Sequence, residues 1–182
     1  MAKQRYTLRD THKYENIRAH AARYPQIEPS SSAACVLLLR GGSDILAAIE
    51  DYLARQGVSQ GRWTVLLLLY RTAELAQNPC ELARKAGVTR ATMTGLLDGL
   101  EKDELIAREP VAADRRMLHV RLTEKGHAFL ERSMPGYFLL IRQLMAGLSE
   151  MEREQMIGLL TKLGATATAG AGVEEEGPGD CD

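Results

Sequence analysis

The sequence lacks the features that mark several protein classes. Its three cysteines are an odd, scattered set, which favours reduced thiols in a cytoplasm over a disulfide framework. No uninterrupted apolar run approaches the ~18 residues of a membrane span, and no apolar stretch follows the basic N-terminus, so neither a membrane partner nor a secretion signal is expected. The histidines and cysteines show no CxxC or HExxH spacing. Gly-rich phosphate loops, nucleophile elbows and paired carboxylates are missing as well. We therefore expect a cytoplasmic protein that is not an enzyme and that binds no metal or cofactor.

The chain also lacks an excess of positive charge, but its charges are unevenly distributed. Residues 164–182 contain five acidic residues and no basic residue, so removing them from the net charge of −1 leaves +4 for residues 1–163. The stretch Leu105–Arg121 has four arginines against Glu109 and Asp114. This basic footprint is modest, and it permits contact with phosphate without proving it. The acidic segment 164–182 is interpreted as a disordered tail.

The most informative stretch lies between residues 78 and 123. Asn78 is a capping residue, Pro79 suits a first helical position, and Glu81 can complete a capping box. A tight turn at Ala86-Gly87 follows, and Thr89 can cap a second helix that runs to about residue 103.

Two short strands, 106–109 and 118–122, follow that helix, with a loop of residues 110–116 between them. Two helices and a two-stranded wing in this order are typical of a winged helix-turn-helix. This fold places the N-terminus of a helix in the DNA major groove.

The exposed side of the second helix would then meet the DNA. Its hydroxyl and guanidinium groups can contact bases and phosphates, and its small residues allow close approach. The predicted contacts are Thr89, Arg90, Ala91, Thr92, Thr94 and Gly95. In the wing loop, Arg115 and Arg116 suit a narrow, electronegative minor groove, and Asp114 can hold one of them through an ion pair. Thr89 is expected to serve as a helix cap as well.

Helical patterns flank this stretch. Residues 1–28 form an extension with its own helical periodicity, interpreted as a packing arm, with a basic arm that touches DNA as the alternative. A long helix is predicted from about Ser31 to Gln56, capped by Ser30–Ser32, and a buried helix follows from about residue 59. Two more helices are predicted, one after Thr123 and one that starts at Ser149, where Glu152 completes a capping box.

The sequence resembles the MarR family of transcriptional regulators over about residues 30–163. The motifs are NPCELARKAGVTRATMTGLLDGLEKDELIAREPVAADRRMLHVRLTEKG and LSEMEREQMIGLLTKL. The family's wing signature, Asp-x-Arg followed by an apolar strand and Leu-Thr, is matched by Asp114, Arg116, Val120, Leu122 and Thr123.

The resemblance implies a mainly α fold with a small β-wing. It divides the chain into a winged domain, 59–123, and dimerisation helices at 29–58 and 124–163. It also implies a homodimer whose two recognition helices enter successive major grooves of double-stranded DNA at a pseudo-palindrome, and release of the DNA by a small molecule or an oxidant.

The residues that would sense such a signal are less clear from the sequence. Arg40, Arg62, Trp63 and His119 are candidates for an effector pocket, although Trp63 also suits the core and the arginines suit the surface. Cys35 and Cys80 are candidates for redox sensing. Cys35 lacks an evident thiolate stabiliser, so a buried structural role is favoured for it. Cys80 lies at a helix N-terminus, where its pKa could be lowered, or it simply packs there.

The sequence thus predicts a homodimeric DNA-binding regulator, acting as a repressor, that a small molecule releases from its operator. Two alternatives stay open. The winged scaffold could serve protein interaction without DNA binding, in keeping with the weak net charge, or the regulator could respond to oxidation of a thiol.

Overall fold

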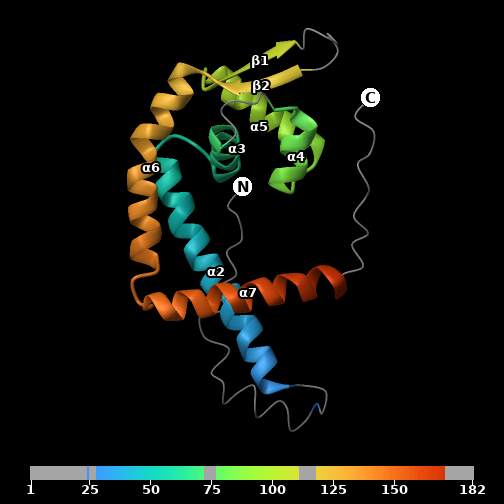
Figure 1. The fold of residues 1–182 in the computed structure, drawn as a ribbon, viewed down its shortest axis with the longest axis vertical. Helices are drawn as coiled ribbons and strands as arrows, with labels where there is room; N and C mark the ends of the chain where they lie inside the picture. The colour runs from blue at the N-terminus through green and yellow to red at the C-terminus, as the bar shows by residue number, and fades with distance from the viewer. Residues whose placement is uncertain (1–23, 25–27, 72–76, 111–117, 171–182) are drawn as a thin grey trace. The chain divides into compact units, whose positions relative to one another are not determined.

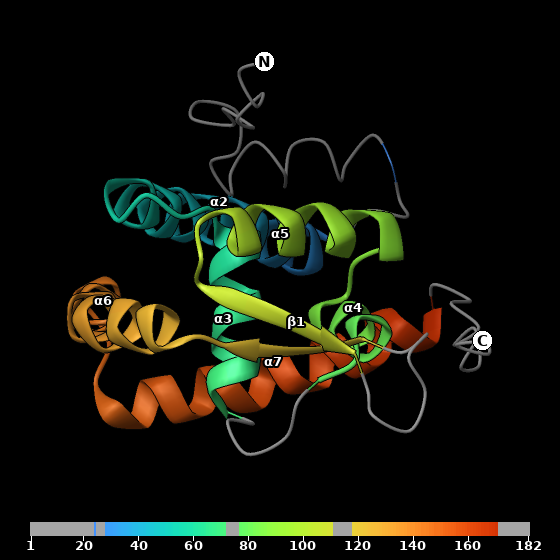
Figure 2. The same ribbon diagram turned by 90° about the horizontal axis from the view of Figure 1, so that it is seen from above.

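The computed structural model describes residue 24 and residues 28–71, 77–110 and 118–170. The chain divides after Val58 into two compact units, and the elements of both can be followed in Figures 1 and 2. One helix, α2, belongs to the first unit, and the helices α3 to α7 and both strands belong to the second. Apart from residues 24 and 28, the predicted extension 1–28 lies outside the described residues.

Helix α2 spans Pro29–Arg55 and begins earlier than predicted. Its N-cap is Glu28, and Pro29 occupies the first turn, where a missing N–H costs no hydrogen bond. The prediction that Ser30–Ser32 cap the helix is therefore wrong; Ser31 instead donates its hydroxyl hydrogen to Glu28 Oε2 at 2.7 Å. The helix ends before Gly57, whose φ of 78° lies in the left-handed region that glycine adopts readily.

Apolar side chains on α2 are largely uncovered in the single chain. Leu37 is 63% exposed and Leu39 is 65% exposed, and a Cβ at Gly41 or Gly42 would meet nothing within 4 Å. By length and composition alone α2 could cross a membrane, since an 18-residue window within it reaches a mean hydropathy of 1.5. A search for uninterrupted apolar runs misses this window because Arg40 and Asp44 break it.

The second unit is built around α3 (Gln60–Arg71), which contacts α4 (Pro79–Ala86), α5 (Arg90–Lys102), α6 (Glu124–Leu144) and strand β2. Four of its twelve residues are buried, and they are Trp63, Val65, Leu66 and Leu69. Leucines of α4 and α5 complete this core. The prediction that the helix after residue 59 lies at the centre of the fold is confirmed for this unit.

The wing is an antiparallel pair of β1 (Ile106–Pro110) and β2 (Leu118–Leu122), adjacent in both views. Its register sets Ile106 opposite Leu122 and Arg108 opposite Val120. Gln77, just before α4, adds an isolated bridge to Val120 through two backbone hydrogen bonds of 2.9 and 3.1 Å. This third strand-like contact was not predicted, and it joins the start of the helix-turn-helix to the wing.

Two helices follow the wing. Helix α6 starts after Thr123, whose hydroxyl accepts from Gly126 N, and it continues through Pro135. Helix α7 spans Glu150–Gly170 and opens with the predicted capping box: Ser149 N donates to Glu152 Oε2 at 2.8 Å, and Glu152 N donates to Ser149 Oγ at 3.4 Å.

The tail was predicted to begin at residue 164, but α7 continues to Gly170. Alanines at 165, 167 and 169 explain the longer helix, because alanine has the highest helix propensity. The rest of the acidic tail lies outside the described residues.

Candidate nucleic-acid interface

The turn between α4 and α5 follows from local capping chemistry. Asn78 accepts a hydrogen bond from Cys80 N at 2.8 Å and so caps α4, while Glu81 pairs with Lys85 at 3.0 Å and does not form the predicted box. Gly87 ends α4 with a φ of 64°, a left-handed conformation that strains any residue with a Cβ. The chain can therefore reverse within a few residues and start α5 at Thr89.

Helix α5 has one buried side and one exposed side. Met93, Leu97 and Leu100 are buried against the rest of the unit. The residues predicted to meet DNA are all exposed, and they are Thr89, Arg90, Ala91, Thr92, Thr94 and Gly95. The N-terminal half of α5 thus presents a continuous polar surface with little side-chain bulk.

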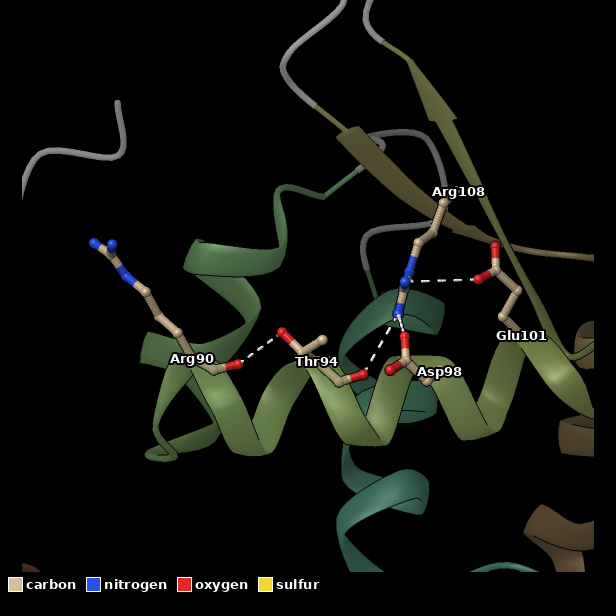
Figure 3. A network of polar contacts seen from close by, with 5 residues as sticks. All are labelled: Arg90, Thr94, Asp98, Glu101 and Arg108. Atoms are coloured by element: carbon tan, nitrogen blue, oxygen red, sulfur yellow. Dashed lines mark hydrogen bonds and ion pairs between the residues drawn. The ribbon is translucent and has the colours of Figure 1, made fainter.

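The hydroxyl groups on this surface already have intramolecular partners. Thr89 Oγ1 accepts from Thr92 N at 3.2 Å, which confirms its role as a cap, and lies 2.9 Å from Thr92 Oγ1. Thr94 Oγ1 donates to the carbonyl oxygen of Arg90 at 3.0 Å, whereas the Arg90 side chain extends away from the helix (Figure 3). A hydroxyl that donates to a carbonyl can still accept from a ligand.

The second half of the exposed side carries carboxylates, and Arg108 of β1 reaches them (Figure 3). One terminal nitrogen of Arg108 donates to Asp98 Oδ1 at 2.7 Å and to the Thr94 carbonyl oxygen at 3.5 Å. The other terminal nitrogen lies 3.6 Å from Glu101 Oε2. This cluster of Thr94, Asp98, Glu101 and Arg108, here called the wing–helix clamp, ties the base of the wing to α5.

A second arginine of the wing is paired within the sheet. Arg121 Nε donates to Glu109 Oε1 at 2.7 Å, and both side chains are about half exposed. This hydrogen bond lowers the pKa of the Glu109 carboxyl and raises the pKa of Arg121. Of the four arginines counted in the basic stretch, Arg108 and Arg121 are thus neutralised by carboxylates.

The remaining two arginines, Arg115 and Arg116, lie outside the described residues, as does Asp114. Their role in the minor groove stays a prediction. The described strands do place the ends of that loop, since β1 ends at Pro110 and β2 begins at Leu118. Strand β1, which precedes that loop in the chain, packs against α5.

The four effector candidates have separate surroundings. Arg62 pairs with Asp103 at 3.0 Å, and its guanidinium lies where a Cβ at position 99 would stand. Trp63 is 2% exposed and packs against the rings of Phe129 and Tyr137; its Nε1 is buried and has no hydrogen-bond partner among the described residues. Arg40 is exposed on α2, and His119 is half-buried on β2. The effector role of all four stays a prediction.

One cysteine differs from what the sequence suggested. Cys35 is a free thiol on α2 and is exposed in the single chain, so the prediction of a buried structural cysteine is wrong for the isolated subunit. The reason is that α2 has little of its surface covered within its own chain. Cys80 lies in the first turn of α4, where its backbone N–H donates to Asn78 Oδ1, and its redox role stays a prediction.

Sequence reasoning missed the clamp, although a signal for it exists. In β1, Arg108 lies two residues after the buried Ile106 and opposite the buried Val120, so it occupies an inward-facing strand position. A charged residue at such a position needs a partner. The prediction counted this arginine only as part of a basic surface.

Comparison with known proteins agrees with this geometry. The model of the MarR family matches residues 58–118. The chain is 34% identical over 156 residues to the HTH-type transcriptional repressor YetL of Bacillus subtilis, covering 86% of this chain and 93% of the relative. It is also 34% identical over 121 residues to the transcriptional repressor MprA of Escherichia coli K12, covering 66% of this chain and 69% of that relative.

A solved structure shares the fold at lower identity. Sco3205 of Streptomyces coelicolor, a MarR-family regulator in complex with DNA, superposes with a TM-score of 0.70 at 21% identity and covers 76% of this chain and 88% of its own. Both sequence relatives are named as transcriptional repressors. The fold has a helix with an exposed polar face and a β-wing packed beside it, as in this solved structure. Together with the family match and the sequence relatives, this shows that the chain belongs to the MarR family of winged-helix transcriptional regulators.

Proposed function

We propose that this regulator is a homodimeric repressor that binds a pseudo-palindromic operator through the N-terminal half of α5 and through the wing loop. The observation that supports it best is the division of α5: Met93, Leu97 and Leu100 are buried in the unit, while the six predicted contact residues on this helix are all exposed. A helix N-terminus that carries an exposed arginine suits both phosphate and guanine. Relatives named as repressors favour repression over activation.

The test is a fluorescence anisotropy titration of the protein with DNA from upstream of its own gene, at several salt concentrations. Arg90→Ala is the diagnostic variant, and Lys102→Ala is the matched control because it removes one positive charge from the other end of the same helix. A guanine contact is worth about 1–3 kcal/mol, so we expect Arg90→Ala to weaken operator binding at least about fivefold. Equal losses of operator affinity in both variants would contradict the assignment of the N-terminal half of α5 as the DNA-binding surface.

Dimerisation is supported by the apolar surface that the single chain leaves open. Exposed large apolar residues occur on α2, on the second half of α6 and on α7, and they include Leu38, Leu46, Phe138, Leu139, Met151, Ile157, Leu160 and Leu163. Large apolar side chains left exposed in such number indicate surfaces that another molecule covers. A second copy of the chain would cover these residues, and the two recognition helices would then reach half-sites roughly 34 Å apart.

Light scattering after size exclusion, without detergent, measures this state directly. We expect a soluble particle of twice the chain mass. A monomer in aqueous buffer would contradict the homodimer, and a protein that needs detergent for solubility would redirect attention to the membrane-length composition of α2.

We also propose that a small molecule releases the DNA, with Arg40, Arg62, Trp63 and His119 as the candidate contacts. This part is supported by family membership. Aromatic acids are the first compounds to test, by their ability to reverse the anisotropy signal of the protein–DNA complex. If an acid releases DNA from all four single alanine variants as readily as from the wild-type protein, these residues do not form the effector pocket.

A further inference from the structure

The wing–helix clamp joins strand β1 to helix α5 through polar contacts. Arg108 lies on β1, yet its guanidinium is held by groups of α5: the carboxylates of Asp98 and Glu101 and the carbonyl oxygen of Thr94. Its side chain is only 20% exposed, although it carries a full positive charge at the surface of the wing. Figure 3 shows the arginine descending from the strand onto the outward side of the helix.

The geometry of this contact is specific. A guanidinium is a planar fork with fixed donor directions, so the hydrogen bond of one nitrogen to Asp98 and the ion pair of the other with Glu101 together restrict how β1 lies relative to α5. Arg108 Nε is buried without a hydrogen-bond partner among the described residues. A buried unpaired donor costs free energy, so the 2.7 Å hydrogen bond to Asp98 and the ion pair with Glu101 are the contacts that favour this position of the guanidinium.

The clamp also lies between the two parts of the proposed DNA-binding surface, which are the N-terminal half of α5 and the wing loop. Arg90, Thr94 and Asp98 follow one another at four-residue steps on the exposed side of α5, so the clamp begins where the predicted DNA contacts end. On the other side, Arg108 lies two residues before Pro110, the last residue of β1 and the start of the predicted wing loop. A major-groove helix and a minor-groove loop can bind together only when their spacing matches the DNA.

We propose that Arg108 is a positioning residue for operator recognition: through Asp98 and Glu101 it holds the wing at the spacing at which α5 and the wing loop engage one duplex simultaneously. Arg108 acts through these carboxylates and does not itself read bases. The proposal rests on the assignment of α5 and the wing as the DNA-binding surface.

The chain offers a close control in Arg121. It lies on the partner strand β2, carries the same charge and is also paired with a glutamate, but its recorded bonds go to Glu109 within the wing. Arg108→Met and Arg121→Met therefore remove the same charge from the same sheet, and only the first variant detaches the wing from α5.

The experiment measures the affinity of full-length variants for operator DNA and for random duplex of equal length, together with the melting temperature. Misplacing a contact by about 1 Å can reduce a position-dependent interaction by about tenfold or more, so we expect Arg108→Met to lose about tenfold in operator affinity beyond Arg121→Met. Affinity for random DNA, which depends mainly on charge, should fall equally in the two variants. Equal operator affinities would overturn the proposal.

A second set of variants separates positioning from simple electrostatics. Arg108→Met leaves two carboxylates unpaired on a DNA-facing helix, and their repulsion of phosphate could alone weaken binding. In the triple variant R108M/D98N/E101Q that repulsion is removed, so random-DNA affinity should return to the wild-type level while operator affinity stays about tenfold low. Recovery of operator affinity in the triple variant would show that charge alone explains the loss and would overturn the positioning role.

Should Arg108→Met unfold, Arg108→Lys carries the test, because lysine keeps the charge and loses the planar fork. It should retain random-DNA affinity and lose operator affinity; wild-type values for both would overturn the proposal. A wild-type protein that cannot distinguish operator from random DNA would instead contradict the proposed function, and that result is visible before any variant is made.

Discussion

Leucines behave differently in the two kinds of helix in this chain. In the winged part, Leu66, Leu82 and Leu100 are each fully buried, on three different helices. On α2 and α7, by contrast, Leu39 is 65% exposed and Leu159 is 66% exposed in the single chain. The residue type is the same, so the difference lies in whether one chain supplies enough neighbours to cover it.

The comparison distinguishes apolar side chains that are buried within one subunit from those that only association with another molecule would bury. The helix-turn-helix and the wing close their core within one subunit, so the recognition surface is supported before any partner binds. Many apolar residues of α2 and α7, such as Leu39 and Leu159, lack such cover, and burial of a leucine contributes about 1.5–3 kcal/mol. Their contribution is therefore expected from association, and variants in the two regions should respond differently to protein concentration.

The largest expected effect comes from truncating a leucine in each region. Leu100→Ala removes a fully buried side chain and should lower the free energy of unfolding by about 2–5 kcal/mol at any protein concentration. Leu159→Ala removes an exposed side chain and should instead weaken the dimer. Chemical denaturation at protein concentrations that span two orders of magnitude distinguishes the two effects.

The comparison would fail if Leu159→Ala lowered stability equally at all concentrations, since that result would place this side chain in an intrachain core. A dimer that dissociates no more readily in Leu159→Ala than in wild type would likewise show that α7 contributes little through this residue.

A smaller effect is expected where α6 meets the turn before the wing. A Cβ at Gly126 would lie 2.1 Å from the carbonyl oxygen of Leu105, which also accepts a hydrogen bond from Thr123 N at 3.2 Å. Because the obstacle is backbone, Gly126→Ala should destabilise the winged unit by about 1–3 kcal/mol, as overpacking does. Thermal unfolding measures it, with Gly95→Ala as the control, since a Cβ there meets nothing within 4 Å. Equal melting temperatures for the two variants would contradict the close contact.

Local signals made much of this fold predictable. Thr89 and the pair Ser149 and Glu152 form their predicted caps because each bond spans only three residues and depends on side-chain type alone. The two strands and the turn at Gly87 follow from similarly short-range patterns. Exposure of the predicted DNA contacts followed from helical periodicity once α5 was placed.

Features that depend on distant residues were not predictable in the same way. Arg108 and Asp98 are ten residues apart and meet only after β1 folds back on α5. Glu104 adopts a φ of 60° in the turn between them, a conformation for which its residue type gives no warning. The exposure of Cys35 depends on what covers α2, which the sequence of one chain does not state.

Variants at Gly95 test the exposed side of α5, which is the proposed DNA-binding surface, rather than the buried core. Gly95 lies inside α5, where alanine is more favourable by about 1 kcal/mol, so Gly95→Ala should raise the melting temperature. Gly95→Leu should keep the fold, because the position is open, yet operator affinity should fall since a bulky side chain prevents close approach of the helix to the DNA. Ala128→Leu, at an exposed position of α6, is the control for added bulk. Operator affinity unchanged in Gly95→Leu would remove this residue from the DNA-facing surface.

The smallest expected effect on stability comes from the start of α7. The described side chains of this helix are all at least partly exposed, so its first turn depends on local capping rather than on a core. Hydrogen bonds from the Ser149 backbone and hydroxyl hold the pKa of the Glu152 carboxyl below its ordinary value of 4.5. A carboxyl whose pKa is lower in the folded state contributes stability above pH 4.5 and loses that contribution as the pH falls below it. Glu152→Gln can keep a capping bond but cannot titrate, so the urea midpoint should fall less between pH 6 and pH 3.5 in this variant than in wild type. Glu150→Gln, which removes a carboxylate from the same turn, should follow wild type; if Glu152→Gln does so as well, the cap contributes nothing that depends on charge.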